Sequence, residues 1–479
     1  GIESSEARFS DRPIWLPWIF GGMPSVHAFN DLSRLYFPNL VFEYINKLGV
    51  PEFWNLIFHL FFGMIGCVVL SRKLKMSKYI ALFSASCFVL LPYLHVMGVH
   101  GHGSQLMSSV YIPWIFWSII RFKEKTSFSN LFTISMFVGL QLLRAHIQIA
   151  YYTWCFIGLY VVFEFIFSKD RKSKFFFGFL ASFVVGFLMS LSIYLPVLNY
   201  TPFSIRSSQL GGAGIDYATN WSMTVFEYIT FILPSFYGFG GQLYSGGMPF
   251  TDYPNYSGIL VLLLAIYSIF SSKGNKLKYF LLTICILSFL LSLGKNFISF
   301  YSFFYSWLPY FNKLRVPVMI VLLLNFSLLI LASLGLKDLV DWIGKLGDYF
   351  FDRFNKLNLY LIISLIAICT LFGLYFNYQG SEVVKNMIFN DVIFLSSIIS
   401  ISLISIIFAV KKFISIKIFS ISIILLTVVD LYRINYMIIY PSRSSLRSSS
   451  LVSQNSIDRV FKENKIIKFL KNEDRKSVV

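Results

Sequence analysis

Ionisable residues of this chain gather in a few short motifs whose residue types fit phosphate binding. The motif LLRAHIQIAYY places Arg144, His146 and Gln148 between two long apolar runs. Ionisable groups at membrane depth are costly and usually functional, so Arg144 and His146 are candidate ligands for an anionic head group. In the alternative interpretation, these side chains only extend from a helix end to the aqueous interface.

Two further cationic motifs border apolar runs. Arg315, in SWLPYFNKLRVPVMI, directly precedes such a run, and a guanidinium can hold a phosphate through two parallel hydrogen bonds. His102, in MGVHGHGSQL, is a candidate phosphate or metal ligand, although the HxH spacing fixes no third metal ligand. A boundary charge at Arg315 and a tight polar turn at His102 are the competing interpretations.

Carboxylates that suit acid–base chemistry lie near the start of the chain. Segment 1–50 contains no spanning run and surrounds the motif RPIWLPWIFGGMPS, whose Trp residues favour the membrane interface. Asp11 and Asp31 lie in this segment and are candidates for a general base that acts on a membrane-embedded substrate. A solvated loop with an aromatic anchor is the alternative interpretation.

A second group of carboxylates lies in the long segment 198–256, which is rich in glycine and aromatic residues. Loops longer than about 15 residues are uncommon unless they are functional. Asp216, Glu227 and Asp252 are candidate sugar ligands, because carboxylates accept hydrogen bonds from hydroxyls and aromatic rings stack on sugar faces. The run VFEYITFILP indicates a short helix on the membrane surface. A simple capping loop is equally compatible with this composition.

Membrane-spanning helices are the elements predicted to position these motifs. Of 479 residues, 56% are hydrophobic and 13% are charged, against about 25% charged in soluble domains. The mean hydropathy is +0.68. These values exclude a disordered chain and argue against a soluble globule. The net charge of +18 indicates basic loops at an anionic bilayer surface rather than nucleic-acid binding, and the five cysteines predict neither a disulfide framework nor a metal site.

The apolar runs predict an all-α, polytopic transmembrane bundle of about twelve spans, since a span needs about 20 apolar residues. The third, fourth and seventh runs are short for a span. The predicted cores are 53–71, 79–97, 105–120, 128–143, 147–168, 175–197, 257–271, 278–294, 316–336, 359–377, 391–410 and 414–432.

Lys and Arg are concentrated in alternate short loops, which the positive-inside rule assigns to the cytoplasm. Segments 335–358 and 456–472 have the spacing of interfacial helices, and Asp430 and Arg433 are interpreted as a structural ion pair. The predicted organisation is an outer loop (1–50), N-terminal transmembrane helices (51–197), a second outer loop (198–256), C-terminal transmembrane helices (257–433) and an outer tail (434–479) that begins a truncated domain.

Several segments, taken in order, resemble the YfhO family of bacterial membrane proteins. They spread from residue 13 to about residue 320, and the spans continue in the style of that family to about residue 433. The segments are PIWLPWIFGGMPS, GHGSQLMSSVYIPWIFW, LQLLRAHIQIAYYT, YATNWSMTVFEYITFILPSFYGFGG, YSGGMPFTDYPNYSGIL and LPYFNKLRVPVMI.

The resemblance implies a GT-C-type glycosyltransferase of the bacterial cytoplasmic membrane, with its active face outside. Such an enzyme moves a sugar from a polyprenyl-phosphate carrier to an envelope glycan or lipid acceptor, without a covalently bound cofactor. Some GT-C enzymes need a divalent metal and others do not. A catalytic carboxylate of the GT-C fold follows its first span, which we expect to precede Gly1, so the base is either Asp11, Asp31 or a residue upstream.

In our hypothesis for such a mechanism, Arg144, His146, Arg315 and His102 hold the lipid-linked phosphate, and Asp216, Glu227 and Asp252 of the substrate loop shape the acceptor or sugar side. Two other functions fit a chain with many spans. One is a flippase or transporter of lipid-linked glycans, although transporters commonly contain two related halves and this sequence shows none. The other is a non-catalytic scaffold for envelope assembly, favoured if the full-length chain lacks a first-loop carboxylate.

Overall fold

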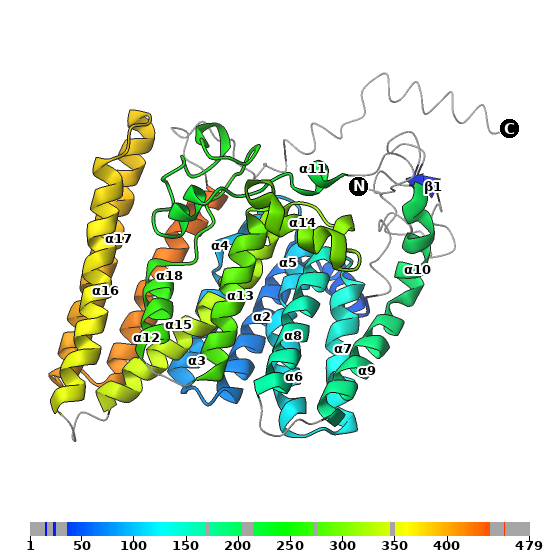
Figure 1. Ribbon diagram of the computed structural model, residues 1–479, viewed down its shortest axis with the longest axis horizontal. Coiled ribbons are helices and arrows are strands. Elements are labelled where there is room, and N and C mark those ends of the chain that lie inside the picture. Colours follow the sequence, from blue (N-terminus) through cyan, green and yellow to red (C-terminus); the bar gives the residue numbers. More distant parts are fainter. Residues whose placement is uncertain are drawn as a thin grey trace.

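Long apolar runs determine the architecture, because a helix is the single-segment structure that satisfies its own backbone polar groups in lipid. The computed structural model describes residues 15–16, 23–24, 36–167, 173–203, 214–271, 275–344, 350–440 and 455. Within these residues the fold is all-helical, as predicted (Figure 1). The exception is a pair of two-residue antiparallel strands, β1 (Trp15–Leu16) and β2 (Met23–Pro24).

Seven helices of the described residues are long and apolar enough to cross a membrane. They correspond to predicted spans one, two, five and nine to twelve. They are α2 (Trp54–Lys73), α3 (Lys78–Val89) with α4 (Pro92–Val99), α8 (Ile147–Phe167), the 3₁₀ helix η8 (Pro317–Ile320) with α15 (Val321–Gly344), Leu357–Phe376 of α16 (Phe350–Phe376), α17 (Glu382–Val410) and α18 (Ile416–Ile439).

Two bent helix pairs raise the number of candidate spans to nine if each pair is one span. The helix α9 (Ser173–Met189) turns by 76° into α10 (Leu191–Tyr200) and η2 (Thr201–Phe203). The helix α13 (Lys276–Ser292) turns by 106°, through η6 (Gly294–Phe297), into α14 (Ile298–Trp307).

The prediction of twelve full spans is therefore too high by this criterion. The third, fourth and seventh runs do form helices, but each helix is shorter than the length needed to span a bilayer alone. The third run is divided between α5 (Gly103–Ser109) and α6 (Ile112–Glu124), and the other two form α7 (Phe128–Leu143) and α12 (Ile259–Ser271).

Tight turns lie along one edge of the bundle, which is the lower edge in Figure 1. Ser77, Ser127 and Ser415 each accept a hydrogen bond from a backbone N–H in the first turn of the helix that follows. Lys75 and Lys412 have φ angles of 60° and 62° and occupy the left-handed position of Schellman motifs that close α2 and α17. These turns belong to the basic loops after α2, α6 and α17, so the structure places these three loops at the same edge of the bundle.

The helix α1 (Pro38–Lys47) precedes α2 in the chain. The opposite edge of the bundle holds the loop elements and α14 (Figure 1). Figure 1 shows α14 lying across this edge, with the loop element α11 (Ile215–Ala218) beside it. Phe303 and Trp307 of α14 are exposed, an aromatic pattern typical of the membrane interface. The sequence analysis did not identify this interfacial element.

The predicted interfacial helix 335–358 is wrong. Residues 335–344 continue α15, where Leu336, Leu339 and Trp342 are buried within the protein. Residues 350–358 begin α16. Over residues 335–344, the helical spacing therefore reflects packing against neighbouring helices rather than a membrane surface. The predicted helix 456–472 lies outside the described residues.

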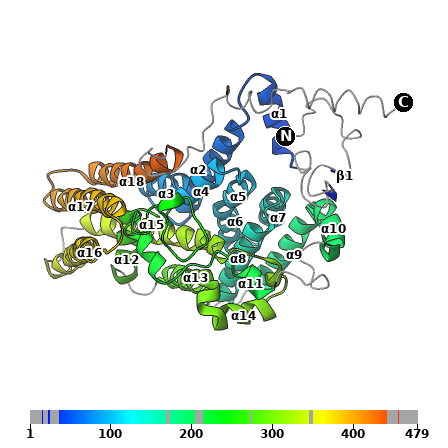
Figure 2. The same ribbon diagram turned by 90° about the horizontal axis from the view of Figure 1, so that it is seen from above.

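The helix α15 is the central element of the bundle. It packs against α12, α13 and α3, and 89% of its most apolar window is buried. Viewed from above, α16, α17 and α18 lie at one end of the molecule and α7, α9 and α10 at the other (Figure 2). The motifs at the ends of α7, α8 and η8 are therefore held by helices that are themselves fixed in the core.

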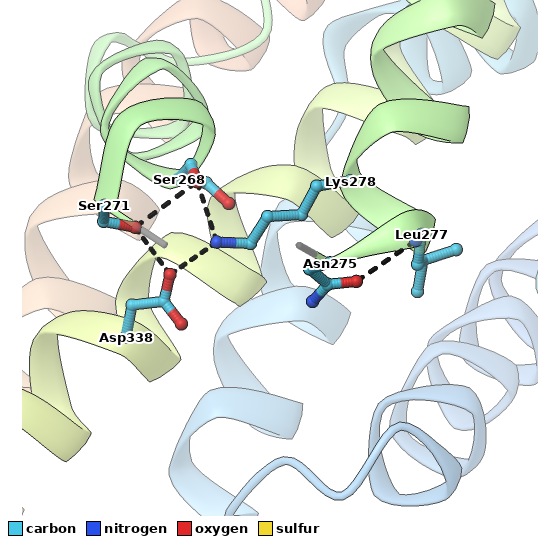
Figure 3. Close-up of polar contacts among 6 residues, drawn as sticks. All are labelled: Ser268, Ser271, Asn275, Leu277, Lys278 and Asp338. Carbon is cyan, nitrogen blue, oxygen red and sulfur yellow. Dashed lines mark hydrogen bonds and ion pairs between the residues drawn. The ribbon is translucent and has the colours of Figure 1, made fainter. Parts of the chain in front are cut away.

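A buried ion pair joins three helices at the basic edge (Figure 3). Lys278 of α13 is only 4% exposed and pairs with Asp338 of α15. Its ammonium group also donates to the backbone carbonyl of Ser268 in α12, at 2.7 Å, and Ser271 donates to the same carboxylate. Several hydrogen bonds thus compensate the desolvation of both charges.

Two buried carboxylates fasten the outer loop to the last helices. Asp391 of α17 pairs with Arg433 of α18 and accepts the backbone N–H of Ser235 at 2.9 Å. Asp430 accepts the hydroxyl of Tyr256 and a backbone N–H at the start of α12. The ion pair expected between Asp430 and Arg433 is therefore wrong, since the partner of Arg433 lies on α17.

Candidate anion-binding site

The turn between α7 and α8 directs two basic residues toward a helix N-terminus. Arg144 is the C-cap of α7, and Ala145 reverses the chain with a left-handed φ of 58°. His146 then precedes α8, and its Nδ1 accepts the backbone N–H of Ile149 at 3.3 Å. The free backbone N–H groups and the dipole of a helix N-terminus favour a bound anion.

Arg144 is partly buried beside neutral groups. Its guanidinium lies 4.6 Å from the ring centroid of Tyr36 and donates to Asn39 Oδ1 at 3.2 Å. Its Nε is buried and makes no hydrogen bond within the described residues. Burial lowers the pKa of Arg144, against the opposing influence of Tyr36 and Tyr111.

No carboxylate of the described residues lies within ion-pair distance of Arg144. A buried guanidinium remains charged, and an uncompensated buried charge is costly. An anion at this position would therefore be stabilised by a charge that the described part of the protein leaves unneutralised.

A hydroxyl network holds Tyr36 under Arg144. The Tyr36 hydroxyl contacts the hydroxyl of Tyr111, at the start of α6, and lies 2.9 Å from Nε2 of His59 in α2. The Nδ1 of His59 lies 2.7 Å from the backbone carbonyl of Asn55, so Nδ1 donates and Nε2 accepts in the neutral ring. The sequence analysis missed these residues. A lone histidine within the apolar run of α2 was the available signal.

Arg315 is attached to the same helix end through its backbone. Gln148, in the first turn of α8, donates to the carbonyl oxygen of Arg315 and accepts its N–H at 3.4 Å. The Arg315 side chain is exposed and donates to the Tyr217 hydroxyl at 2.6 Å. Arg144, His146 and the backbone of Arg315 thus lie next to the N-terminus of α8, and their common role in phosphate binding stays a prediction.

The backbone after Arg315 is strained. Val316 has a φ of 59°, which is unusual for a β-branched residue and costs about 1–3 kcal/mol. Such a conformation persists only where neighbouring structure maintains it. The two hydrogen bonds between Gln148 and the backbone of Arg315 help to fix the chain at this point, together with the hydrogen bond from the N–H of Met319 to the carbonyl oxygen of Val316.

Replacement of Gln148 by leucine is therefore expected to release the 308–316 loop. The variant loses both hydrogen bonds to Arg315, and we expect at least a tenfold loss of any activity that depends on Arg315, with most of α8 unchanged. Circular dichroism and phosphate-lipid binding would be measured together. Equal binding by the Gln148→Leu variant and the wild type would contradict this role.

The carboxylates of the outer loop differ in their surroundings. Asp216 is exposed on α11, next to the Tyr217 that binds Arg315. Asp252 is half-exposed, with its Oδ2 4.0 Å from Nδ1 of His100. Glu227 is only 2% exposed.

Glu227 is part of a capping box at the 3₁₀ helix η4 (Phe226–Phe231). Its Oε2 accepts the backbone N–H of Thr224 at 2.6 Å, and Thr224 Oγ1 accepts the N–H of Glu227 at 3.2 Å. The other carboxylate oxygen accepts the hydroxyl of Tyr244, and this contact, after burial, raises the pKa of Tyr244. The segment VFEYITFILP does contain a short helix, of the 3₁₀ type, and its position on a membrane surface stays a prediction.

Replacement of Glu227 by alanine is expected to destabilise the outer loop by about 1–3 kcal/mol, because buried donors lose their acceptor. The readout is limited proteolysis of residues 214–258 together with the melting temperature. Asp216→Ala, at an exposed position of the same loop, is the matched control. A melting temperature unchanged by Glu227→Ala would contradict the capping role.

His102 is exposed at the start of α5, and its Nδ1 lies 2.9 Å from the carbonyl of His100. No contact joins it to Arg144 or Arg315 in the described residues. Across those residues no group of three or more His, Cys, Asp or Glu side chains could hold a metal. Asp11 and Asp31 lie outside the described residues.

A small cavity lies beneath the outer loop, between Glu227, Tyr237 and Asn255. Its volume is about 10 Å³, which is far below the usual 300–1,000 Å³ of ligand sites. We therefore place the candidate site at the N-terminus of α8, where the charges are, rather than in this cavity.

Comparisons with known proteins leave the chain without a family assignment. No protein-family model matches it, and no curated protein matches it. Among solved structures, it is similar to ArnT from Cupriavidus metallidurans bound to undecaprenyl phosphate. That alignment has a TM-score of 0.42 and 10% sequence identity, and it covers 87% of this chain and 67% of ArnT.

Proposed function

We propose that the chain is a membrane glycosyltransferase that moves a sugar from a polyprenyl-phosphate carrier to an extracytoplasmic envelope acceptor. The observation that carries this proposal is the group of two arginines and a histidine around the N-terminus of α8, where no described carboxylate neutralises the partly buried guanidinium of Arg144. A phosphate ester that enters from the membrane would complete this site.

In this proposal each residue has a distinct role. Arg144 and Arg315 hold the phosphate, and His146 orients the first turn of α8 toward it. A first-loop carboxylate, either Asp11 or Asp31 or a residue upstream, removes the proton from the acceptor hydroxyl. The hydroxyl oxygen forms a bond to the anomeric carbon with inversion, and the bond from that carbon to the phosphate oxygen breaks.

The leaving phosphate keeps the electron pair of the broken bond, so negative charge grows beside Arg144 and Arg315 during the reaction. Donors fixed where charge develops are among the largest contributions to catalysis. His102 and the substrate-loop residues Asp216 and Asp252 remain proposed contacts to the donor or acceptor. Glu227 is proposed to act only through the shape of the loop, since both of its oxygens are occupied.

Transport of lipid-linked glycans is the second candidate, and the two bent helix pairs favour it, because transporters use broken helices. In transporters these breaks lie near the membrane midplane and carry the binding site. Here α14 lies across an edge of the bundle (Figure 1), and the charged cluster lies at the turn of α7 and α8. This arrangement favours chemistry at the interface.

The test uses the full-length natural protein in nanodiscs with radiolabelled polyprenyl-phosphate sugars and membrane-extracted acceptors. Sugar transfer by the wild type supports the proposal, and its loss in Asp11→Asn or Asp31→Asn would identify the base. Translocation of the carrier lipid without sugar transfer would overturn the proposed enzymatic function and establish transport instead.

A further inference from the structure

A basic pocket lies at the edge of the bundle that carries the basic turns, which is the edge opposite to the N-terminus of α8. It is formed by the turn between α2 and α3 and by the last turns of α15, it is open to solvent, and its volume is about 470 Å³. This volume lies within the range of ligand sites. Three cations line it, Arg72, Lys75 and Lys337, against the single carboxylate of Asp341.

The turn between α2 and α3 fixes the positions of Arg72 and Lys75. Arg72 donates to the carbonyl oxygen of Met76 at 2.7 Å across the turn. The Schellman motif sets the direction of Lys75, which has a left-handed φ of 60°. Ser77, which also lines the pocket, caps the N-terminus of α3. The positive end of the twelve-residue helix α3 therefore faces the same space as the cations.

Lys75 and Lys337 have no ion-pair partner in the described part of the chain. No carboxylate of the described residues lies within ion-pair distance of Lys75 or Lys337. Asp338, the neighbour of Lys337 in sequence, is committed to Lys278 on another face of α15 (Figure 3). An anion with several oxygen acceptors fits this arrangement.

We propose that this pocket binds a phosphate group, supplied by the head group of an anionic phospholipid or by a soluble phosphate. The pocket lies where the candidate spans α2 and α15 end and α3 begins, which is the depth at which lipid head groups are found. Basic pockets between helices bind such head groups. This inference does not depend on the proposed glycosyltransferase activity.

The test compares wild type with the K75Q/K337Q variant, in a neutral detergent, by native mass spectrometry and by melting temperature. The probes are dioleoyl phosphatidic acid, dioleoyl phosphatidylcholine and inorganic phosphate. The matched control is K411Q/K412Q, which removes two exposed charges from the same edge, including a lysine at the same left-handed position of a Schellman motif.

Wild type is expected to bind phosphatidic acid at least tenfold more tightly than phosphatidylcholine, and K75Q/K337Q to lose about tenfold or more of that affinity. Binding of inorganic phosphate that is lost in K75Q/K337Q would also support the pocket and would identify a soluble source. Equal losses in the control variant, or no loss in K75Q/K337Q with an unchanged melting temperature, would overturn the proposal.

Discussion

Replacement of Arg144 by alanine is expected to reduce kcat/KM for sugar transfer by about 10²–10³-fold, the usual cost of removing a donor that stabilises developing charge. Its guanidinium is partly buried at the end of α7 and has only neutral partners among the described residues. Arg144→Lys keeps the charge but loses the planar fork, so its activity is expected to lie between those of the wild type and the alanine variant.

A matched control is Arg121→Ala. Arg121 stacks over Trp117 at 4.6 Å from the ring centroid, the same separation as Arg144 from Tyr36, but it lies at the basic edge of the bundle. It should retain transfer within about twofold. The control also separates catalysis from folding, since both substitutions remove one cation–π contact of about 0.5–2 kcal/mol. Equal activity losses in both variants would contradict a phosphate-binding role for Arg144.

Replacement of Asp391 by alanine is expected to cause the largest loss of stability, about 3–5 kcal/mol. The substitution leaves the Arg433 guanidinium without its carboxylate and the Ser235 N–H without its acceptor. The outer loop around Ser235 should become accessible to protease. The measurement is unfolding by denaturing detergent, followed by tryptophan fluorescence.

The double variant Asp391→Leu/Arg433→Leu should recover much of this stability, because it leaves no buried charge unpaired. Glu382→Ala is the surface control. Its carboxylate is 81% exposed and lies 3.8 Å from Lys385, so we expect a change within about 0.5 kcal/mol. A loss in Asp391→Ala no larger than in Glu382→Ala would show that the buried pair does not fasten the loop.

Composition was sufficient to predict the helical class and the order of the long spans. Hydropathy reports how apolar a run is but not where it bends, so the 76° and 106° turns after α9 and α13 were not foreseen. At the second turn, Gly294 has a positive φ of 44°, a conformation that glycine adopts readily. Helical spacing alone also failed to distinguish the buried end of α15 from an interfacial helix.

The candidate site was partly predictable because Arg144, His146 and Gln148 are close in sequence. Their partners are not, since Asn39 is 105 residues from Arg144 and Arg315 is 167 residues from Gln148. Such contacts depend on how the helices pack, which local patterns do not specify. The structural role of Glu227 could be predicted from the sequence, because Thr224, three residues earlier, completes a capping-box motif.

Photolabelling with a polyprenyl phosphate that carries a diazirine near the phosphate tests the central claim most directly. The full-length protein in nanodiscs would be labelled, digested and mapped by mass spectrometry. We expect labelled peptides from 144–148 and 308–316, with labelling reduced at least tenfold in Arg144→Ala/Arg315→Ala and unchanged in Arg121→Ala. Labelling that avoids both segments, or that persists in the double variant, would contradict a phosphate-binding site at the N-terminus of α8.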